Sequence, residues 1–189
     1  MKLFKAILAI LIFTTTVTFA QKSVYANFPE TFDSPDTSAK AHYKKADVAL
    51  NSGAWNFDNA ILAALQGHDK YNGKQGVRIQ QNRAKPSYVE MNFDLTEGAS
   101  KVTVAYASYY KDASCVWRLE YSTDGGTTWV QAGKDINAEA KELKTAEFIL
   151  DLKGKVRFRI NKLGLGDGKT DPNIKNGRLS IDDIAIYKN

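Results

Sequence analysis

The sequence predicts an all-β protein, an antiparallel sandwich of about nine or ten strands. Apolar and polar residues alternate with a period of two in several stretches, as expected for strands that bury one face. Clusters of Gly, Asn and Asp separate these stretches at short, even intervals and are typical of turns. The chain has 189 residues, enough for one domain with a sizeable core. It shows no internal repeat, which disfavours a propeller.

The N-terminal residues are typical of an export signal. Lys2 and Lys5 precede an apolar run over 6–13, and Ala20 supplies the small residue expected before a cleavage point, with Ala26 as the alternative. We predict a signal peptide over residues 1–20, a mobile lead-in over 21–28 and a single sandwich domain over 29–189. The protein is then exported to the periplasm, the cell surface or the medium. The apolar run is too short to span a membrane, and we expect no span in the mature chain.

The expected strands follow one another along the chain. The clearest is 88–95, in which Val89, Met91 and Phe93 share one face. The full set is 30–33, 46–50, 55–62, 77–80, 88–95, 102–106, 115–121, a partner strand beginning at 130, 146–150, 156–160 and 179–186. Residues 137–143 fit either one helical turn or a long loop.

The octet Ser122–Trp129 is the most specific motif of the chain and reads S-T-D-G-G-T-T-W. Its Asp-Gly-Gly core tolerates the positive φ angles of a hairpin reversal, and the Asp124 carboxylate can accept hydrogen bonds from the turn. We therefore predict a β-hairpin here, with Trp129 folded over the turn. The octet resembles the Asp-box of bacterial sialidases and related secreted β-proteins, in which it is a structural turn and not a catalytic site.

Composition and motifs narrow the function classes. The net charge of +5 includes Lys2 and Lys5 of the predicted signal, and the other basic residues form no dense block, which disfavours nucleic acid. The single cysteine, Cys115, excludes an internal disulfide and is expected to be a buried, inert thiol. His42 and His68 lack metal-binding spacing. We expect no enzyme, with an unrecognised pair of carboxylates as the catalytic alternative.

Acidic residues lie at both ends of the predicted domain. Glu30 and Asp33 begin it, and Asp182 and Asp183 lie in its last strand. If the terminal strands are neighbours, these carboxylates converge, and Ca²⁺ is the ion that takes six to eight such oxygens. The alternative is that they are strand-end acids in solvent or paired with Lys and Arg. The acidic loop 167–173 departs from the EF-hand pattern and is expected to be a surface loop.

Aromatic residues are the candidates for ligand binding. Sugar rings stack their apolar faces on Trp or Tyr, with hydrogen bonds from nearby polar groups. The predicted ligand-binding residues are Trp55, Tyr71, Tyr109, Tyr110 and Arg78. Tyr109 and Tyr110 are adjacent in a strand, so at least one ring must leave the core face. The alternative to ligand binding for Trp55 is a position in the hydrophobic core.

Two further patterns carry a family resemblance. The strand 179–186 reads L-x-I-D-D-I-x-I and is paired with an early E-x-F-D segment; together they resemble the jelly-roll sandwiches of the MAM and galactose-binding-like type. The G-x-W segment at 53–55, followed by a D…G…G-x-R stretch over 69–78, resembles secreted versions from Gram-negative bacteria. The resemblance covers nearly the whole mature chain. It implies a jelly roll and a structural Ca²⁺ held by Glu30, Asp33 and Asp182 or Asp183.

These observations together predict an exported, non-catalytic binding module with carbohydrate as the first-choice ligand. The alternatives are an adhesion or protein-interaction domain, or an accessory module that works beside a secreted hydrolase or endonuclease. The expected partner is accordingly a glycan or a cell-surface protein.

Overall fold

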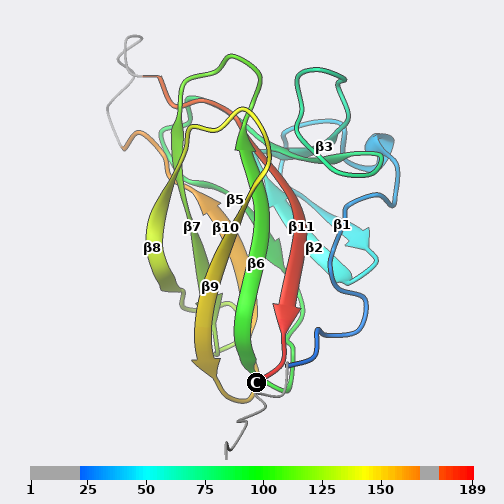
Figure 1. The fold of residues 1–189 in the computed structure, drawn as a ribbon, viewed down its shortest axis with the longest axis vertical. Helices are drawn as coiled ribbons and strands as arrows, with labels where there is room; N and C mark the ends of the chain where they lie inside the picture. The colour runs from blue at the N-terminus through cyan, green and yellow to red at the C-terminus, as the bar shows by residue number, and fades with distance from the viewer. Residues whose placement is uncertain (1–21, 167–174) are drawn as a thin grey trace, which may run out of the picture.

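The computed structural model describes residues 22–166 and 175–189. Over these residues the chain forms eleven strands in two antiparallel sheets, stacked as a sandwich (Figure 1). The predicted all-β antiparallel sandwich is thus confirmed. No helix in the described ranges is long and apolar enough to cross a membrane. The predicted signal over 1–20 and the acidic loop over 167–173 lie outside the described residues.

The two sheets contain six and five of the described strands. The six-stranded sheet runs in the order β1 (Ala46–Leu50), β2 (Gly53–Asp58), β5 (Ser87–Met91), β10 (Arg157–Lys162), β7 (Cys115–Ser122) and β8 (Val130–Ala138). The five-stranded sheet runs in the order β3 (Ala60–Ala63), β4 (Gly76–Ile79), β11 (Leu179–Tyr187), β6 (Ala99–Ser108) and β9 (Lys144–Leu152). A short 3₁₀ turn, η1 (Thr37–Lys40), precedes β1.

One predicted strand, 55–62, is in fact two, β2 and β3. The stretch 55–62 breaks at Asn59, whose φ of 52° lies in the left-handed region that Asn tolerates. Before the break β2 belongs to the six-stranded sheet, and after it β3 belongs to the five-stranded sheet. Asn59 is therefore a corner at which the chain passes from one layer to the other.

Two terminal predictions are corrected. Residues 30–33 form no strand beyond a single bridge from Glu30 to Ile184, because Phe32 has a φ of 57° that turns the backbone away. The stretch 21–28, predicted to be a mobile lead-in, packs on β11 in its described part. The Tyr25 amide donates to the Ile186 carbonyl at 2.9 Å, and the Tyr25 ring is buried. The domain thus includes residues before 29.

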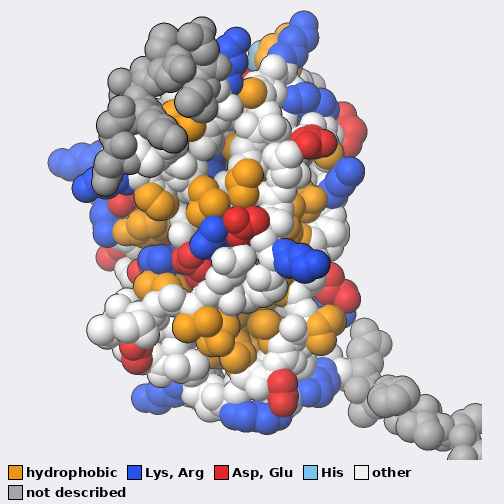
Figure 2. All heavy atoms as spheres, turned by 90° about the vertical axis from the view of Figure 1, so that its left-hand side faces the viewer, with side chains coloured by type: hydrophobic (Ala, Val, Ile, Leu, Met, Phe, Trp, Pro, Cys, Tyr) orange, Lys and Arg blue, Asp and Glu red, His pale blue; other side chains and the backbone are white. Residues whose placement is uncertain are grey.

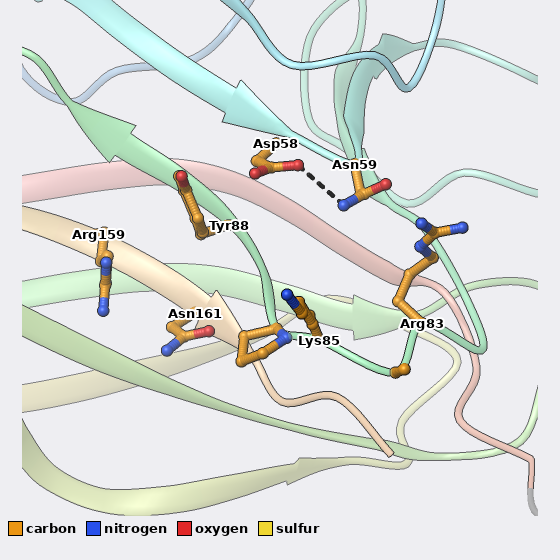
Figure 3. Close-up of a pocket in the computed structure, with 9 residues that line it drawn as sticks. Asp58, Asn59, Arg83, Lys85, Tyr88, Arg159 and Asn161 are labelled. Atoms are coloured by element: carbon orange, nitrogen blue, oxygen red, sulfur yellow. Dashed lines mark hydrogen bonds between the residues drawn. The ribbon is translucent and has the colours of Figure 1, made fainter. Parts of the chain in front are cut away.

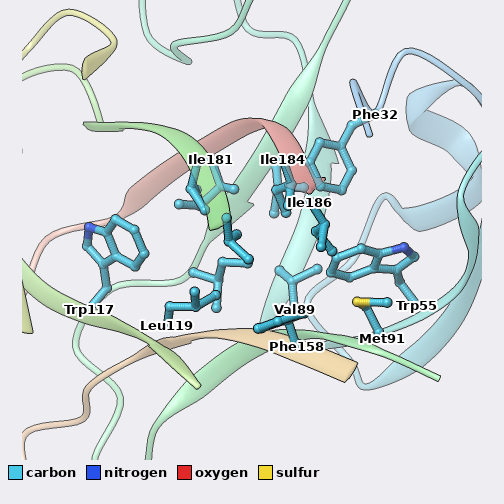
Figure 4. Packing of buried hydrophobic residues seen from close by; sticks show 14 of the residues in the cluster. Phe32, Trp55, Val89, Met91, Trp117, Leu119, Phe158, Ile181, Ile184 and Ile186 are labelled. Atoms are coloured by element: carbon cyan, nitrogen blue, oxygen red, sulfur yellow. The ribbon is translucent and has the colours of Figure 1, made fainter. Parts of the chain in front are cut away.

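Apolar side chains from both sheets fill the space between them. Figure 4 shows Trp55 and Trp117 at two ends of this cluster, with Ile181 and Ile184 of β11 among the residues between them. Full burial of each large apolar side chain stabilises the fold by about 1.5–3 kcal/mol. Cys115 is also buried, as predicted, and burial raises the pKa of its thiol to about 11.

The predicted hairpin joins β7 to β8. The Asp124 carboxylate accepts hydrogen bonds from the Thr128 hydroxyl at 2.6 Å and the Thr128 amide at 2.9 Å. These bonds, with one from the Ser122 hydroxyl, lower the pKa of Asp124 to about 2. Trp129 folds over the turn and donates its indole N–H to the Gly126 carbonyl at 3.1 Å. The hairpin prediction is confirmed.

Glu30 is a fully buried carboxylate with protein donors around it. It accepts hydrogen bonds from the Phe32 amide at 2.9 Å, the Ser52 amide at 2.9 Å and the Ser52 hydroxyl at 2.7 Å. The Ser52 hydroxyl in turn accepts from the Trp55 indole at 2.9 Å. One acid therefore joins the N-terminal segment, the β1–β2 turn and the core.

We predict that Glu30→Gln destabilises the domain by about 1–3 kcal/mol, because an amide nitrogen replaces one acceptor and faces protein donors. Urea unfolding followed by tryptophan fluorescence measures the loss. Glu142→Gln, whose side chain is 87% exposed, is the control for the same carboxylate-to-amide change outside the core. An unfolding midpoint for Glu30→Gln equal to that of the wild type contradicts this role.

Candidate functional site

The structure removes Trp55 from the predicted ligand-binding residues. Its side chain is fully buried between the sheets, and its indole N–H is bonded to Ser52. No face of the ring is available for stacking. The G-x-W segment places Trp55 at an inward position of β2, so the core alternative is correct.

Tyr109 and Arg78 are also committed to internal contacts. Tyr109 is 4% exposed, and the guanidinium carbons of Arg178 and Arg78 lie 3.9 and 4.8 Å from its ring centroid. Arg78 binds Asp69 through two hydrogen bonds, from Nε at 2.7 Å and from Nη2 at 2.5 Å. The cluster buries the tyrosine ring, so stacking of a ligand on Tyr109 is excluded.

Tyr110 and Tyr71 keep exposed surface, and both lie at the loop 67–71. Tyr110 is 39% exposed, and its ring centroid is 4.2 Å from that of His68. Tyr71 lines a hollow of about 460 Å³ together with Gly67 and Asp69, the neighbours of His68. Four of the five predicted ligand residues are therefore gathered around this loop, whereas Trp55 lies in the core.

Three of the four predicted metal ligands gather around the loop 72–75, where they bind backbone and side-chain donors. Asp182 Oδ2 accepts from the Asn72 amide at 2.6 Å, and Asp183 Oδ2 accepts from the Asn72 side chain at 2.5 Å. Asp33 Oδ1 accepts from the Lys74 amide at 2.6 Å. Both ends of the described domain thus hold the same loop.

The predicted set of four carboxylates is not assembled, because Glu30 is occupied by Phe32 and Ser52. Among the described residues no group of three or more His, Cys, Asp or Glu side chains is arranged to hold a metal ion. Asp182 is nevertheless unusual, since it is fully buried and has no ion pair in the described ranges. Burial, with Asp183 and Asp33 nearby, raises its pKa to about 7.

A different site lies on the outer face of the six-stranded sheet. A hollow of about 590 Å³ is open there between the ends of β2, β5 and β10 and the loop that precedes β5 (Figure 3). Its lining residues are Asp58, Asn59, Arg83, Ala84, Lys85, Pro86, Tyr88, Arg159 and Asn161. We call it the sheet-face hollow. It contains an aromatic ring, charged groups and amides, which is the composition of a ligand site.

A polar network forms the floor of the sheet-face hollow. Arg159 Nε donates to Glu120 at 2.6 Å, and its Nη1 lies 3.4 Å from Glu90. Asn161 is 6% exposed and donates from Nδ2 to Glu120 at 3.0 Å. Its Oδ1 has no hydrogen-bond partner among the described residues, and Figure 3 shows it on the side of Lys85. A buried acceptor without a donor costs free energy that a bound hydroxyl would recover.

Two aromatic rings flank Arg159 on this face. The guanidinium carbon lies 5.5 Å from the Tyr88 ring centroid and 4.3 Å from that of Trp129. The Lys45 ammonium donates to the Tyr88 hydroxyl at 2.7 Å. Tyr88 is half-buried, so part of its ring faces the hollow. The hydrogen bond from Lys45 fixes the orientation of that ring.

Sequence reasoning missed this site, although a signal was present. Tyr88 and Glu90 occupy the outward positions of β5, and Arg159 and Asn161 occupy those of β10. A polar face that combines Tyr, Arg and Asn on two strands is unusual for plain solvent exposure. The adjacency of these strands in the sheet was the missing information, because β5 and β10 are far apart in the sequence.

Comparisons with known proteins give likenesses of structure only. No protein-family model matches the chain, and no curated protein matches it. Among solved structures, the CBM22-1 xylan-binding domain of Xyn10C from Paenibacillus barcinonensis is similar with a TM-score of 0.52 and 12% identity, over 89% of this chain and 97% of that one. The K2 cleaved adhesin domain of Lys-gingipain is similar with a TM-score of 0.59 and 14% identity, over 87% and 99%.

At these identities the likeness establishes the fold. The two sheets share the jelly-roll fold of the matched domains, and the predicted jelly-roll fold is confirmed. The matched domains are covered almost completely, so the fold as a whole is shared and not one hairpin of it.

The raised pKa of Asp182 makes the stability of the fold depend on pH, which can be tested. Its pKa is about 7 in the folded chain against 3.8 in the unfolded one, so the folded state holds a proton that the unfolded state has released. The contribution of this group to stability therefore falls as pH rises from about 4 to about 7. From pH 5 to pH 8 we predict a fall in the free energy of unfolding for the wild type. For Asp182→Asn the fall is predicted to be smaller, by more than about 1 kcal/mol.

Urea unfolding at the two pH values, in buffer with chelator, measures this difference. Asp47→Asn, at an exposed strand position, is the matched control. Parallel pH profiles for the wild type and Asp182→Asn contradict the assignment.

Proposed function

We propose that this protein is an exported, non-catalytic carbohydrate-binding domain that holds its ligand in the sheet-face hollow. The observation that carries the proposal is the unpartnered, buried Oδ1 of Asn161 beside the partly exposed ring of Tyr88. A sugar presents both hydroxyl donors and an apolar C–H face, which are the groups that this acceptor and this ring would bind.

The remaining lining groups fit the same ligand. Asp58 and Asn59 supply acceptors and donors at one end of the hollow, joined by a hydrogen bond of 2.8 Å (Figure 3). The fold likeness to a domain described as xylan-binding supports a glycan as the ligand class. The export predicted from residues 1–20 would bring the domain to extracytoplasmic polysaccharides, where it could serve beside a secreted hydrolase.

The geometry favours binding over catalysis. Asp58 is the one carboxylate among the described residues that line the hollow. Glu90 and Glu120 lie at its floor, and both are engaged by the Arg159 guanidinium, so they do not form a pair of carboxylates that is free to flank a glycosidic bond. We therefore assign these two residues to positioning Arg159 and Asn161, and not to glycoside hydrolysis.

We predict that Tyr88→Ala and Asn161→Ala each weaken glycan binding at least about tenfold, equivalent to about 1.4 kcal/mol. Tyr88→Ala removes the stacking ring, and Asn161→Ala removes the acceptor that has no hydrogen-bond partner among the described residues. Calorimetry against a ligand selected on a glycan array measures the loss. Tyr110→Ala, which removes an exposed ring elsewhere, is expected to bind as the wild type does. Loss of binding in Tyr110→Ala with binding retained in Tyr88→Ala places the site elsewhere.

We also propose a structural Ca²⁺ beside Asp33, Asp182 and Asp183, without Glu30. The three side chains are not arranged as a metal site in the described residues, so the ion would have to draw them together. The support is the charge of this cluster, in which a buried acid has two acidic neighbours. The ion would supply the cation that Asp182 lacks among the described residues, and it would fasten both chain ends to the loop 72–75.

Added Ca²⁺ is expected to raise the melting temperature of chelator-treated protein, by several degrees at pH 8 and less at pH 5. Differential scanning calorimetry with Ca²⁺ and with Mg²⁺ measures the shift. The shift is expected to vanish in Asp182→Asn. If neither chelator nor added Ca²⁺ changes the melting temperature at pH 8, the proposed ion is ruled out.

An adhesion or protein-interaction domain is the second candidate. Figure 2 shows an edge of the sandwich, where apolar side chains lie among charges of both signs. On the edge strands β8 and β9, Val130 is 50% exposed and Ile149 is 74% exposed. The fold likeness to an adhesin domain agrees with this use. Ile149→Lys separates the candidates, because it would disturb a protein contact and leave the sheet-face hollow intact.

A further inference from the structure

We propose that the glycan bound in the sheet-face hollow is acidic, with a carboxylate or sulfate group held between Arg83 and Lys85. This inference rests on the proposed function and adds the chemical class of the ligand. Arg83 and Lys85 lie on the loop that borders the hollow, whereas Tyr88, Arg159 and Asn161 lie on the sheet (Figure 3). A sugar ring on Tyr88 would therefore direct one substituent towards the loop.

The charges around the hollow are unequal. Three basic residues line it, Arg83, Lys85 and Arg159, against the single acid Asp58. Arg159 is balanced by Glu120 and Glu90 and has little charge left for a ligand. Arg83 and Lys85 are exposed and form no ion pair within the described ranges. Among the described residues, the positive charge that has no acid paired with it is thus concentrated at the loop.

The loop is held in place before any ligand binds. The Leu165 amide donates to the Arg83 carbonyl at 2.9 Å, and the Gly166 amide donates to the Ala84 carbonyl at 3.0 Å. Gly164 lies so close that a Cβ there would be 2.2 Å from the Ala84 carbonyl oxygen. These contacts fix the backbone that carries both cations, which lowers the ordering cost of binding an anion.

Asp58 determines the orientation of an acidic ligand in the hollow. It lies at the β2 end of the hollow, and its carboxylate repels an anionic group placed there while accepting sugar hydroxyls. The guanidinium of Arg83 offers paired donors that match the oxygens of a carboxylate or a sulfate. The anion therefore belongs at the loop, and neutral hydroxyls belong near Asp58 and Asn161.

Nucleic acid fits this arrangement less well. A strand of phosphates needs a continuous basic stripe with several stacking rings. Among the described residues, the hollow offers one lining ring, Tyr88, and two cations without a paired acid. Single-stranded DNA is therefore an outcome to be tested and not the ligand we expect.

The test uses polysaccharides that differ only in charge. Polygalacturonan is compared with its fully methyl-esterified form, and a sulfated galactan with its desulfated form, while neutral xylan and an oligodeoxythymidine complete the panel. Calorimetry with the whole mature chain, at about 50 and about 300 mM NaCl, measures the affinity. We expect at least one charged form to bind about tenfold more tightly than its neutral partner, with the preference reduced by salt.

Arg83→Gln/Lys85→Gln is expected to abolish the preference for the charged form and to leave binding of the neutral form within about twofold. Lys153→Gln/Lys155→Gln removes the same charge from the exposed β9–β10 turn and is expected to keep the preference. Circular dichroism and melting temperature verify that both variants fold.

The two proposals fail in different ways. Equal binding of charged and neutral forms, lost in Tyr88→Ala, overturns the acidic ligand and leaves carbohydrate binding in place. A charge preference that survives Arg83→Gln/Lys85→Gln also overturns it. Absence of binding to every glycan in the panel overturns both proposals, and oligodeoxythymidine binding lost in Arg83→Gln/Lys85→Gln would replace them with nucleic-acid recognition.

Discussion

The hydrogen-bonded carboxylate of Glu30 is the constraint on which the closure of this sandwich depends. A buried charge is tolerated only when donors surround it, and here the donors come from the N-terminal segment and from the β1–β2 turn at Ser52. The backbone of the same residue pairs with Ile184 of β11. One residue thus fixes the first segment against the last strand through its backbone and, through its side chain and Ser52, against Trp55 in the core.

The sheet-face hollow depends on the register of β10. Arg159 lies opposite Glu90 on one neighbouring strand and opposite Glu120 on the other, so its two acids are placed by strand pairing and not by loops. The same pairing places Asn161 opposite Tyr88. A shift by one residue would turn all of these side chains into the core. The floor of the hollow is therefore as rigid as the sheet.

The sequence predicted the layers of the protein better than its site. Alternation located most strands and the turn residues located the hairpin, because both depend on neighbours in the chain. To predict the ligand-binding residues, one must know which aromatic rings point outward from the sheets. Trp55 faces the core and Tyr88 faces the solvent, although each lies in a strand with alternating residues. Of the predicted metal ligands, Asp33, Asp182 and Asp183 do lie in one region. Glu30 is not among them, because its carboxylate binds the donors of Ser52. No local pattern indicates such long-range contacts.

The tight contact at Gly164 has a consequence for how this surface can diversify. The segment 163–166 and the segment 83–85 are bonded along their backbones, so a change of length in one would displace the other. A new ligand preference would accordingly arise in evolution through concerted changes in two segments that are remote in the gene. An engineer who wishes to transplant this rim onto another jelly roll would need to move both segments together.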